Sequence, residues 1–211
     1  MPMPGKFTAD DFVTAAIRLV LAGGSGAATA TAVAHAVGAP SGSVYHRFPK
    51  RSDLRAAAWL TPVRRFHEDF LPVLAADGDP VAAGIEAARQ VLLWSAKNRD
   101  AAALLARYSR SDFVGADCSP EVLAEADALD RDTADALAAF LARFPAADRD
   151  RVLLAVIDAP LALVRRSLAA KGPNTRTAEL AADVARRLLA QPTDRGPQAG
   201  LPSRPAARAK R

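Results

Sequence analysis

Cysteine and long apolar runs are scarce in this sequence, and each scarcity excludes a class of protein. The one cysteine, Cys118, allows no disulfide within the chain and is typical of a reducing cytoplasm. No apolar run reaches the roughly 18 residues that a membrane-spanning helix needs. Asp10 and Asp11 interrupt the stretch in which a signal peptide would have its apolar core. We therefore expect a cytoplasmic protein with no membrane segment.

The signatures of catalysis and metal binding are absent too. The histidines and the cysteine are too scattered along the chain for a convincing zinc site. The sequence also lacks a phosphate-binding glycine loop and a nucleophile elbow. We expect no metal, no cofactor and no catalytic residue, which leaves a small helical enzyme as a disfavoured alternative.

What the sequence does contain favours an all-α fold. Half of its 211 residues are apolar, which is ample for a core, whereas aromatic residues make up only 6%. Alanine and leucine favour helices, and they outnumber the residues that favour strands. Apolar spacing, caps and breakers predict about nine helices and no strand. Besides one at Ser41–Phe48, they are expected at Thr8–Ala22, Thr29–Val37, from Ser52 with a kink or break at Pro62, Asp79–Asn98, Ala101–Tyr108, Pro120–Phe144, Asp148–Ala170 and Thr175–Leu189.

Basic residues are concentrated at the two ends of the chain. Residues 1–60 hold six Lys and Arg against three Asp and Glu, residues 61–190 hold 17 against 19, and residues 191–211 hold five against one. This distribution suggests that a polyanion meets the ends, although a solvated basic face has the same composition. Four prolines and two glycines in the last 21 residues predict a disordered tail.

The most informative segment runs from about residue 28 to residue 48. Thr29 is placed to cap a short helix that Gly38 ends, and a second short helix stops before Pro49. Two short helices joined by a glycine-containing turn form the helix-turn-helix of DNA-binding proteins. The residues expected to pack the two helices together are Val33, Ala34, Val37, Val44 and Phe48. The residues expected to face base edges and phosphates are Ser41, Gly42, Ser43, Tyr45 and His46.

The second of these helices resembles the DNA-binding domain of the TetR family of bacterial transcriptional regulators. The family pattern is a small residue, Gly, Thr or Ser, an aliphatic residue, Tyr, a variable pair and Phe. Here it is matched by Ser41-Gly42-Ser43-Val44-Tyr45-His46-Arg47-Phe48. The similarity extends over about residues 8–58, and the remaining chain agrees with the family in helix number and length. Pro40 departs from the polar cap usual in the family, so the helix begins either there or at Ser41.

The resemblance implies a division into modules and a set of DNA contacts. Residues 1–50 would form a three-helix DNA-binding domain, 51–190 a helical-bundle domain for effector binding and dimerisation, and 191–211 the tail. Thr29 and Thr31 would lie at phosphates, and the basic Lys50 and Arg51 are placed for phosphate contact after the second helix. Ser41, Gly42 and Ser43 would face the major groove, while Tyr45 and His46 would bind backbone or bases. Tyr45 fits a core position equally well, and Phe48 fits one better.

The resemblance also implies an unidentified small-molecule effector, held among the central helices of the second domain. Phe66, Trp94, Tyr108 and Phe113 are candidate lining residues, although ordinary core positions explain these aromatic residues equally well. Asp158 interrupts an apolar run. It binds a polar group of the effector, pairs with an arginine or faces water, and the last two are favoured.

The predicted function is therefore a homodimeric repressor that an effector releases from a palindromic operator in double-stranded DNA. An activator of the same fold would have the same sequence features. The residues expected at a four-helix dimer interface are Val152, Val156, Leu163, Leu180, Val184 and Leu188. The basic tail either adds DNA affinity without sequence preference or is padding. The main alternative is a helical ligand-binding protein of the same fold that has lost DNA binding.

Overall fold

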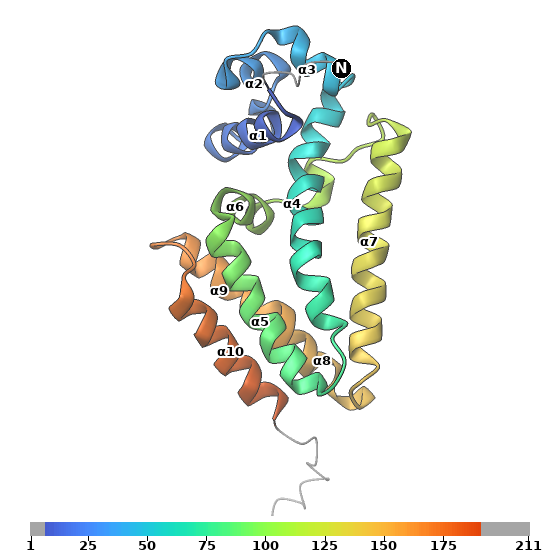
Figure 1. The fold of residues 1–211 in the computed structure, drawn as a ribbon, viewed down its shortest axis with the longest axis vertical. Helices are drawn as coiled ribbons and strands as arrows, with labels where there is room; N and C mark the ends of the chain where they lie inside the picture. Colours follow the sequence, from blue (N-terminus) through green and yellow to red (C-terminus); the bar gives the residue numbers. More distant parts are fainter. Residues whose placement is uncertain (1–6, 191–211) are drawn as a thin grey trace, which may run out of the picture.

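A computed structural model describes residues 7–190 of the chain, and that range contains helices and no strand. Residues 149–168 run continuously from α8 to α9; counted as one helix, they bring the α-helices of the described range to nine, as predicted. The elements, shown in Figure 1, are α1 (Ala9–Gly23), α2 (Ala30–Val37), α3 (Ser41–Arg47), α4 (Arg51–Leu74), α5 (Pro80–Lys97), α6 (Arg99–Arg107), α7 (Pro120–Leu141), α8 (Arg149–Leu153), α9 (Ala159–Leu168) and α10 (Thr175–Leu189). The tail predicted to be disordered lies outside the described residues.

The ends of the first two helices follow from capping residues. Thr8 accepts a hydrogen bond from the Asp11 amide at 3.2 Å, and the Asp11 carboxylate accepts from the Thr8 amide at 2.7 Å. This reciprocal pair starts α1. The hydroxyl of Thr29 accepts from the Ala32 amide at 3.1 Å and starts α2. Both predicted starts are therefore confirmed.

α4 is a single helix that connects the top of the molecule to its lower half (Figure 1). Pro62 lies inside it and is buried, so the break considered there does not occur. A proline removes one helical hydrogen bond and crowds the preceding turn. Contacts with α1, α5, α6 and α7 hold α4 along its length, and this packing outweighs the local cost.

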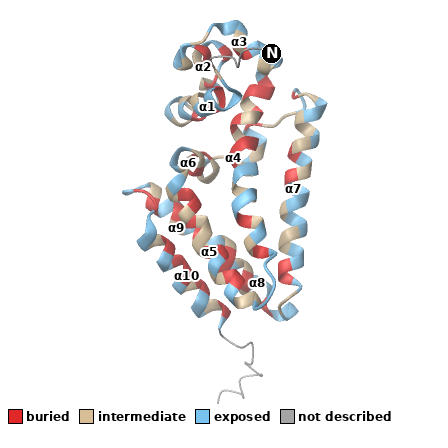
Figure 2. Ribbon diagram, viewed as in Figure 1, coloured by how far each residue is buried: buried red, intermediate tan, exposed pale blue. Residues whose placement is uncertain are grey.

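Two large apolar clusters form the core. Figure 2 shows buried residues in red in both the upper and the lower part of the molecule. The lower cluster joins α4, α5, α7, α8, α9 and α10. The upper cluster joins α1, α2 and α3 to the start of α4, and it also includes Leu104 of α6 and Phe113. Side chains of residues 104 and 113 thus complete the core of the DNA-binding module predicted at residues 1–50. Its division from the rest at residue 50 remains a proposal.

The last helices correct one sequence prediction. Val152 and Val156 were expected at a dimer interface, but both are fully buried in the lower core of the same chain. A π-helical segment (Leu154–Asp158) separates α8 from α9, just before Pro160. A proline ring crowds the carbonyl one turn earlier, and a widened turn relieves that contact. Large apolar side chains that do reach the surface of these helices are Leu154, 44% exposed, and Leu180, 46% exposed.

His67 of α4 links that helix to α7. Its Nε2 lies 2.9 Å from the hydroxyl of Thr133, which donates to the Leu129 carbonyl oxygen, also at 2.9 Å. Thr133 therefore accepts from a neutral His67 protonated on Nε2, and the buried Nδ1 makes no hydrogen bond with residues 7–190. Burial lowers the pKa of His67, against the opposing effect of the Asp132 and Asp130 carboxylates.

We expect the protein to lose stability as the pH falls, in part through His67. In the unfolded chain the pKa of a histidine has its ordinary value of about 6.5. Because the folded pKa is lower, the unfolded state binds the proton first, and the His67 contribution is lost below about pH 6.5. Urea unfolding at pH 7.5 and 5.5 measures this. The variant H67Q should lose less stability than wild type between the two pH values, whereas H35Q, at an exposed histidine of α2, should behave as wild type. Equal losses in wild type and H67Q would contradict the assignment.

Candidate nucleic-acid interface

α2 and α3 pack on each other through small and branched apolar side chains. Val33 and Val44 are fully buried and Ala34 is 1% exposed. Val37 and Phe48 pack against the same cluster from its edge. Gly38, with φ of 75°, takes the left-handed conformation that ends α2 and turns the chain towards α3. The packing predicted for a helix-turn-helix is present.

α3 begins at Ser41. Pro40 occupies the capping position with φ of −59° and makes no side-chain hydrogen bond, while its carbonyl oxygen accepts from the Ser43 amide at 2.9 Å. Of the two starts that the sequence left open, the structure has the later one. This fixes the register in which the side chains of α3 leave the helix.

The packing leaves one side of α3 open to solvent. The exposed residues on this side are Ser41, Gly42, Tyr45 and His46, and Ser43 is half-buried. Tyr45 is 45% exposed, so it is not a core residue. Arg47 points the other way, because its guanidinium donates to the Phe7 carbonyl oxygen and lies 5.5 Å from the ring centroid of Phe12. The structure therefore brings the residues predicted on α3 together on one surface.

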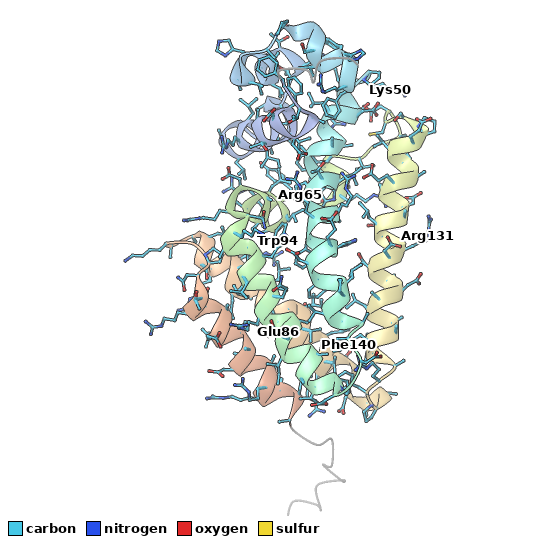
Figure 3. The ribbon with its side chains drawn as sticks, viewed as in Figure 1. Lys50, Arg65, Glu86, Trp94, Arg131 and Phe140 are labelled. Atoms are coloured by element: carbon cyan, nitrogen blue, oxygen red, sulfur yellow. The ribbon has the colours of Figure 1, made fainter. Side chains whose placement is uncertain are left out.

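The predicted phosphate contacts have different surroundings. Thr31 and Arg51 are exposed, and Thr29 is exposed while it caps α2. Lys50 is labelled in Figure 3 at the upper end of α4. Its Nζ lies 3.4 Å from the carbonyl oxygens of both Asp117 and Cys118. Its ammonium is thus already drawn towards the loop before α7.

That loop is tied to the start of α4 by two further hydrogen bonds that the sequence analysis missed. Ser52 Oγ donates to the Asp117 carbonyl oxygen at 2.9 Å, and the Ser119 amide donates to Asp53 Oδ1 at 2.8 Å. Asp53 is only 6% exposed, and its carboxylate faces this loop and not solvent. The partners lie more than 60 residues apart, and no local pattern marks them.

The stretch of chain that contains α2 and α3 carries no acidic residue. No Asp or Glu occurs between Asp11 and Asp53, whereas Lys50 and Arg51 follow α3 directly; Arg18, in the same stretch, is paired with Asp100. Because Asp53 is buried against the loop before α7, it adds no carboxylate to the exposed side of α3. A polar surface with hydroxyls, an exposed Tyr and nearby cations suits contact with a phosphate backbone.

The residues predicted to line an effector pocket are divided among three places. Phe66 and Trp94 are in contact, with ring centroids 5.2 Å apart, and Phe66 also stacks on Phe70 at the lower core. Tyr108 and Phe113 pack edge to face at 5.6 Å in the upper cluster. Asp158 is exposed on the π-helical segment. The structure brings together two pairs and leaves Asp158 apart from both.

Metal-binding clusters and membrane-spanning helices are both absent from the described residues. Within residues 7–190, no group of three or more His, Cys, Asp or Glu residues is arranged to hold a metal ion. None of the helices in this range is long and apolar enough to span a bilayer.

This arrangement of helices is the fold of the TetR-family transcriptional regulators. A TetR-like regulator from Rhodococcus sp. RHA1 is 22% identical, with a TM-score of 0.63 over 90% of this chain and 99% of that one. The TetR-family regulator PfmR from Thermus thermophilus is 21% identical, with a TM-score of 0.64 over 92% and 100%. The regulator FadR from Bacillus subtilis, solved in complex with stearoyl-CoA, is 12% identical, with a TM-score of 0.62 over 87% and 98%.

At these identities the likeness is one of fold. No protein-family model matches the sequence, and no curated protein does either. The chain thus shares its all-α architecture with these regulators, and this likeness does not extend to what it binds.

Proposed function

We propose that the chain is a TetR-family regulator that binds operator DNA through α2 and α3, as a cytoplasmic homodimer. The observation that carries the proposal is the exposed polar side of α3, in a stretch without a carboxylate from residue 12 to residue 52. Ser41, Gly42 and Ser43 would meet the major groove, Tyr45 and His46 the backbone or bases, and Thr29, Thr31, Lys50 and Arg51 the phosphates. A two-fold dimer would read a palindromic site.

We further propose that the protein is a repressor. A small molecule would release it by binding below the head, the unit formed by α1, α2 and α3. The contact between Phe66 and Trp94 supports an apolar part of such a site, and a neighbour of the same fold holds stearoyl-CoA. Tyr108, Phe113 and Asp158 stay candidates for the same role. Release requires that the effector bind the DNA-free conformation more tightly than the DNA-bound one.

Selection from a randomised duplex pool, followed by titration of the selected sequence at several salt concentrations, tests the DNA-binding proposal. We expect a palindrome bound about 10³-fold or more tightly than random duplex, as in specific regulators. Weak binding that is blind to sequence and vanishes with salt would contradict the proposal. It would favour a ligand-binding protein, and turnover of a bound compound would instead reveal an enzyme.

Single substitutions distinguish base contacts from phosphate contacts. Y45A should weaken operator binding by about 10-fold or more, in line with a lost contact of about 1–3 kcal/mol. R51Q should weaken all duplexes alike and reduce the salt slope by about one. The matched control is R131Q, which removes an exposed arginine from the middle of α7, far from Lys50 in Figure 3. If R131Q weakens DNA binding as much as R51Q, net charge rather than contact explains both.

A further inference from the structure

A second surface, below the head, has the chemistry of an anion-binding site. α6 and α9 pack against each other, and a cleft of about 450 Å³ opens beside them. In Figure 1, α6 lies between α1 above and α9 below, away from α3. The charged residues that line the cleft are Arg99, Asp100, Arg107 and Arg165. Its volume falls within the range of small-molecule sites, about 300–1,000 Å³.

The three arginines of this cleft have no carboxylate partner among the described residues. Arg165 Nε donates to the Ala106 carbonyl oxygen at 3.3 Å, and Arg107 Nη1 donates to the Leu21 carbonyl oxygen at 3.2 Å. A guanidinium carries five N–H donors, so most donors of both remain unused. Asp100, the one acidic residue of the lining, is paired with Arg18 of α1 at 3.1 Å. Most of the positive charge of the cleft is therefore uncompensated.

The guanidinium of Arg99 lies against the backbone of Gly172. An added Cβ on Gly172 would lie 2.4 Å from Arg99 Nη2 and 2.5 Å from its Cζ, so the guanidinium rests directly on this glycine. Gly172 has a φ of +88°, which also favours glycine there. The loop between α9 and α10 thus leaves room for Arg99 at the edge of the cleft, where it makes no ion pair with the described residues.

We propose that this cleft binds an organic phosphate. The fork of donors on an arginine matches phosphate oxygens, and three arginines suit a group with two or more negative charges. The remaining wall is apolar and would contact the organic part of the molecule: Ala103, Ala106, Leu168 and Ala169. The ligand is therefore a small phosphorylated compound with an apolar body.

The cleft is connected to the head through the end of α1. Arg107 bonds Leu21, Asp100 pairs with Arg18, and Tyr108, next in sequence, lies 3.4 Å from the Val20 carbonyl oxygen. A phosphate that recruits Arg107 competes with its bond to Leu21 and loosens the contact between α6 and α1. This coupling to DNA rests on the proposed function, whereas phosphate binding itself does not.

Isothermal titration calorimetry with phenyl phosphate tests the site directly, with benzoate and phenol as comparison probes. We expect phenyl phosphate to bind wild type more tightly than benzoate and phenol not to bind. R165Q and R99Q should each weaken phenyl phosphate by about 10-fold or more, the effect of a lost charge-assisted hydrogen bond. R166Q is the matched control, since this exposed arginine adjoins Arg165 in sequence and does not line the cleft. It should bind as wild type.

Absence of binding, equal binding of benzoate, or equal weakening in R166Q and R165Q would each overturn the proposal. Far-UV circular dichroism of every variant shows that it is folded, and R165K, which keeps the charge without the fork, should bind between wild type and R165Q. Operator binding measured without phenyl phosphate tests the proposed function separately. With DNA binding established, an unchanged operator affinity at saturating phenyl phosphate would overturn the coupling alone.

Discussion

Replacing Phe12 by alanine is expected to destabilise the protein by about 3–5 kcal/mol, the usual cost of deleting a fully buried aromatic side chain. Phe12 is completely buried in the upper cluster, 6.4 Å from the ring of Phe7, and the Arg47 guanidinium packs against its face. Its loss removes the side chain on which α1, Phe7 and Arg47 at the end of α3 converge. Urea unfolding measures the change, and specific DNA binding should fall with it.

The half-buried Phe144, at the opposite end of the molecule, supplies the control for F12A. F144A should cost less and leave DNA binding intact, because Phe144 packs only against the edge of the lower core. A loss below about 1 kcal/mol in F12A would contradict the expected role of Phe12.

The two tryptophans show how far the damage in F12A extends. Trp59 stacks on Phe113 at 5.6 Å in the upper cluster, and Trp94 lies beside Phe66 in the lower half. Fluorescence of F12A combined with W94F follows the upper cluster, and F12A combined with W59F follows the lower half. Separate transitions would support division into modules near residue 50, whereas coincident transitions would make the upper cluster and the lower half one cooperative unit.

Introducing charge at Leu154 and Leu180 is expected to convert the proposed dimer into monomers. These are the large apolar side chains that the last helices expose, at 44% and 46%, and carboxylates there would have to be desolvated in an interface. In L154D/L180D, operator affinity should fall by about 100-fold or more, because one half-site alone contributes little beyond non-specific binding. Size-exclusion chromatography with light scattering gives the mass, and a gel-shift titration gives the affinity.

The matched control for this pair adds the same charge to α7. A124D/A138D replaces two exposed alanines and should stay dimeric with unchanged affinity. If L154D/L180D remains dimeric, the two subunits meet through another surface.

Local signals predicted the ends of several helices. Thr8, Thr29 and Gly38 act within a few residues of themselves, so their effect could be read from the sequence. α10 was predicted at Thr175–Leu189 and is found there, because its apolar residues recur at a single spacing between clear breakers.

Features that depend on distant parts of the chain could not be predicted. The helix through Pro62 persists because neighbouring helices support it. Val152 and Val156 lie on an apolar stripe, but periodicity shows only that a stripe is buried and not whether its own chain or a partner buries it. The bonds of Lys50, Ser52 and Asp53 to residues 117–119, and the meeting of Arg99, Arg107 and Arg165, join segments that no local pattern relates.

If the protein binds DNA as proposed, the unbroken length of α4 determines how small a movement in the lower half would alter the position of the head on DNA. Its 24 residues extend about 36 Å at roughly 1.5 Å per residue. Pivoting such a rod by about 5° at its lower end displaces its upper end by about 3 Å, close to the roughly 3.4 Å rise of one base pair. In the proposed dimer the two heads would move oppositely about a two-fold axis, which would double the mismatch with a palindrome. A few degrees of tilt would therefore suffice to dislodge the protein, with every helix otherwise intact.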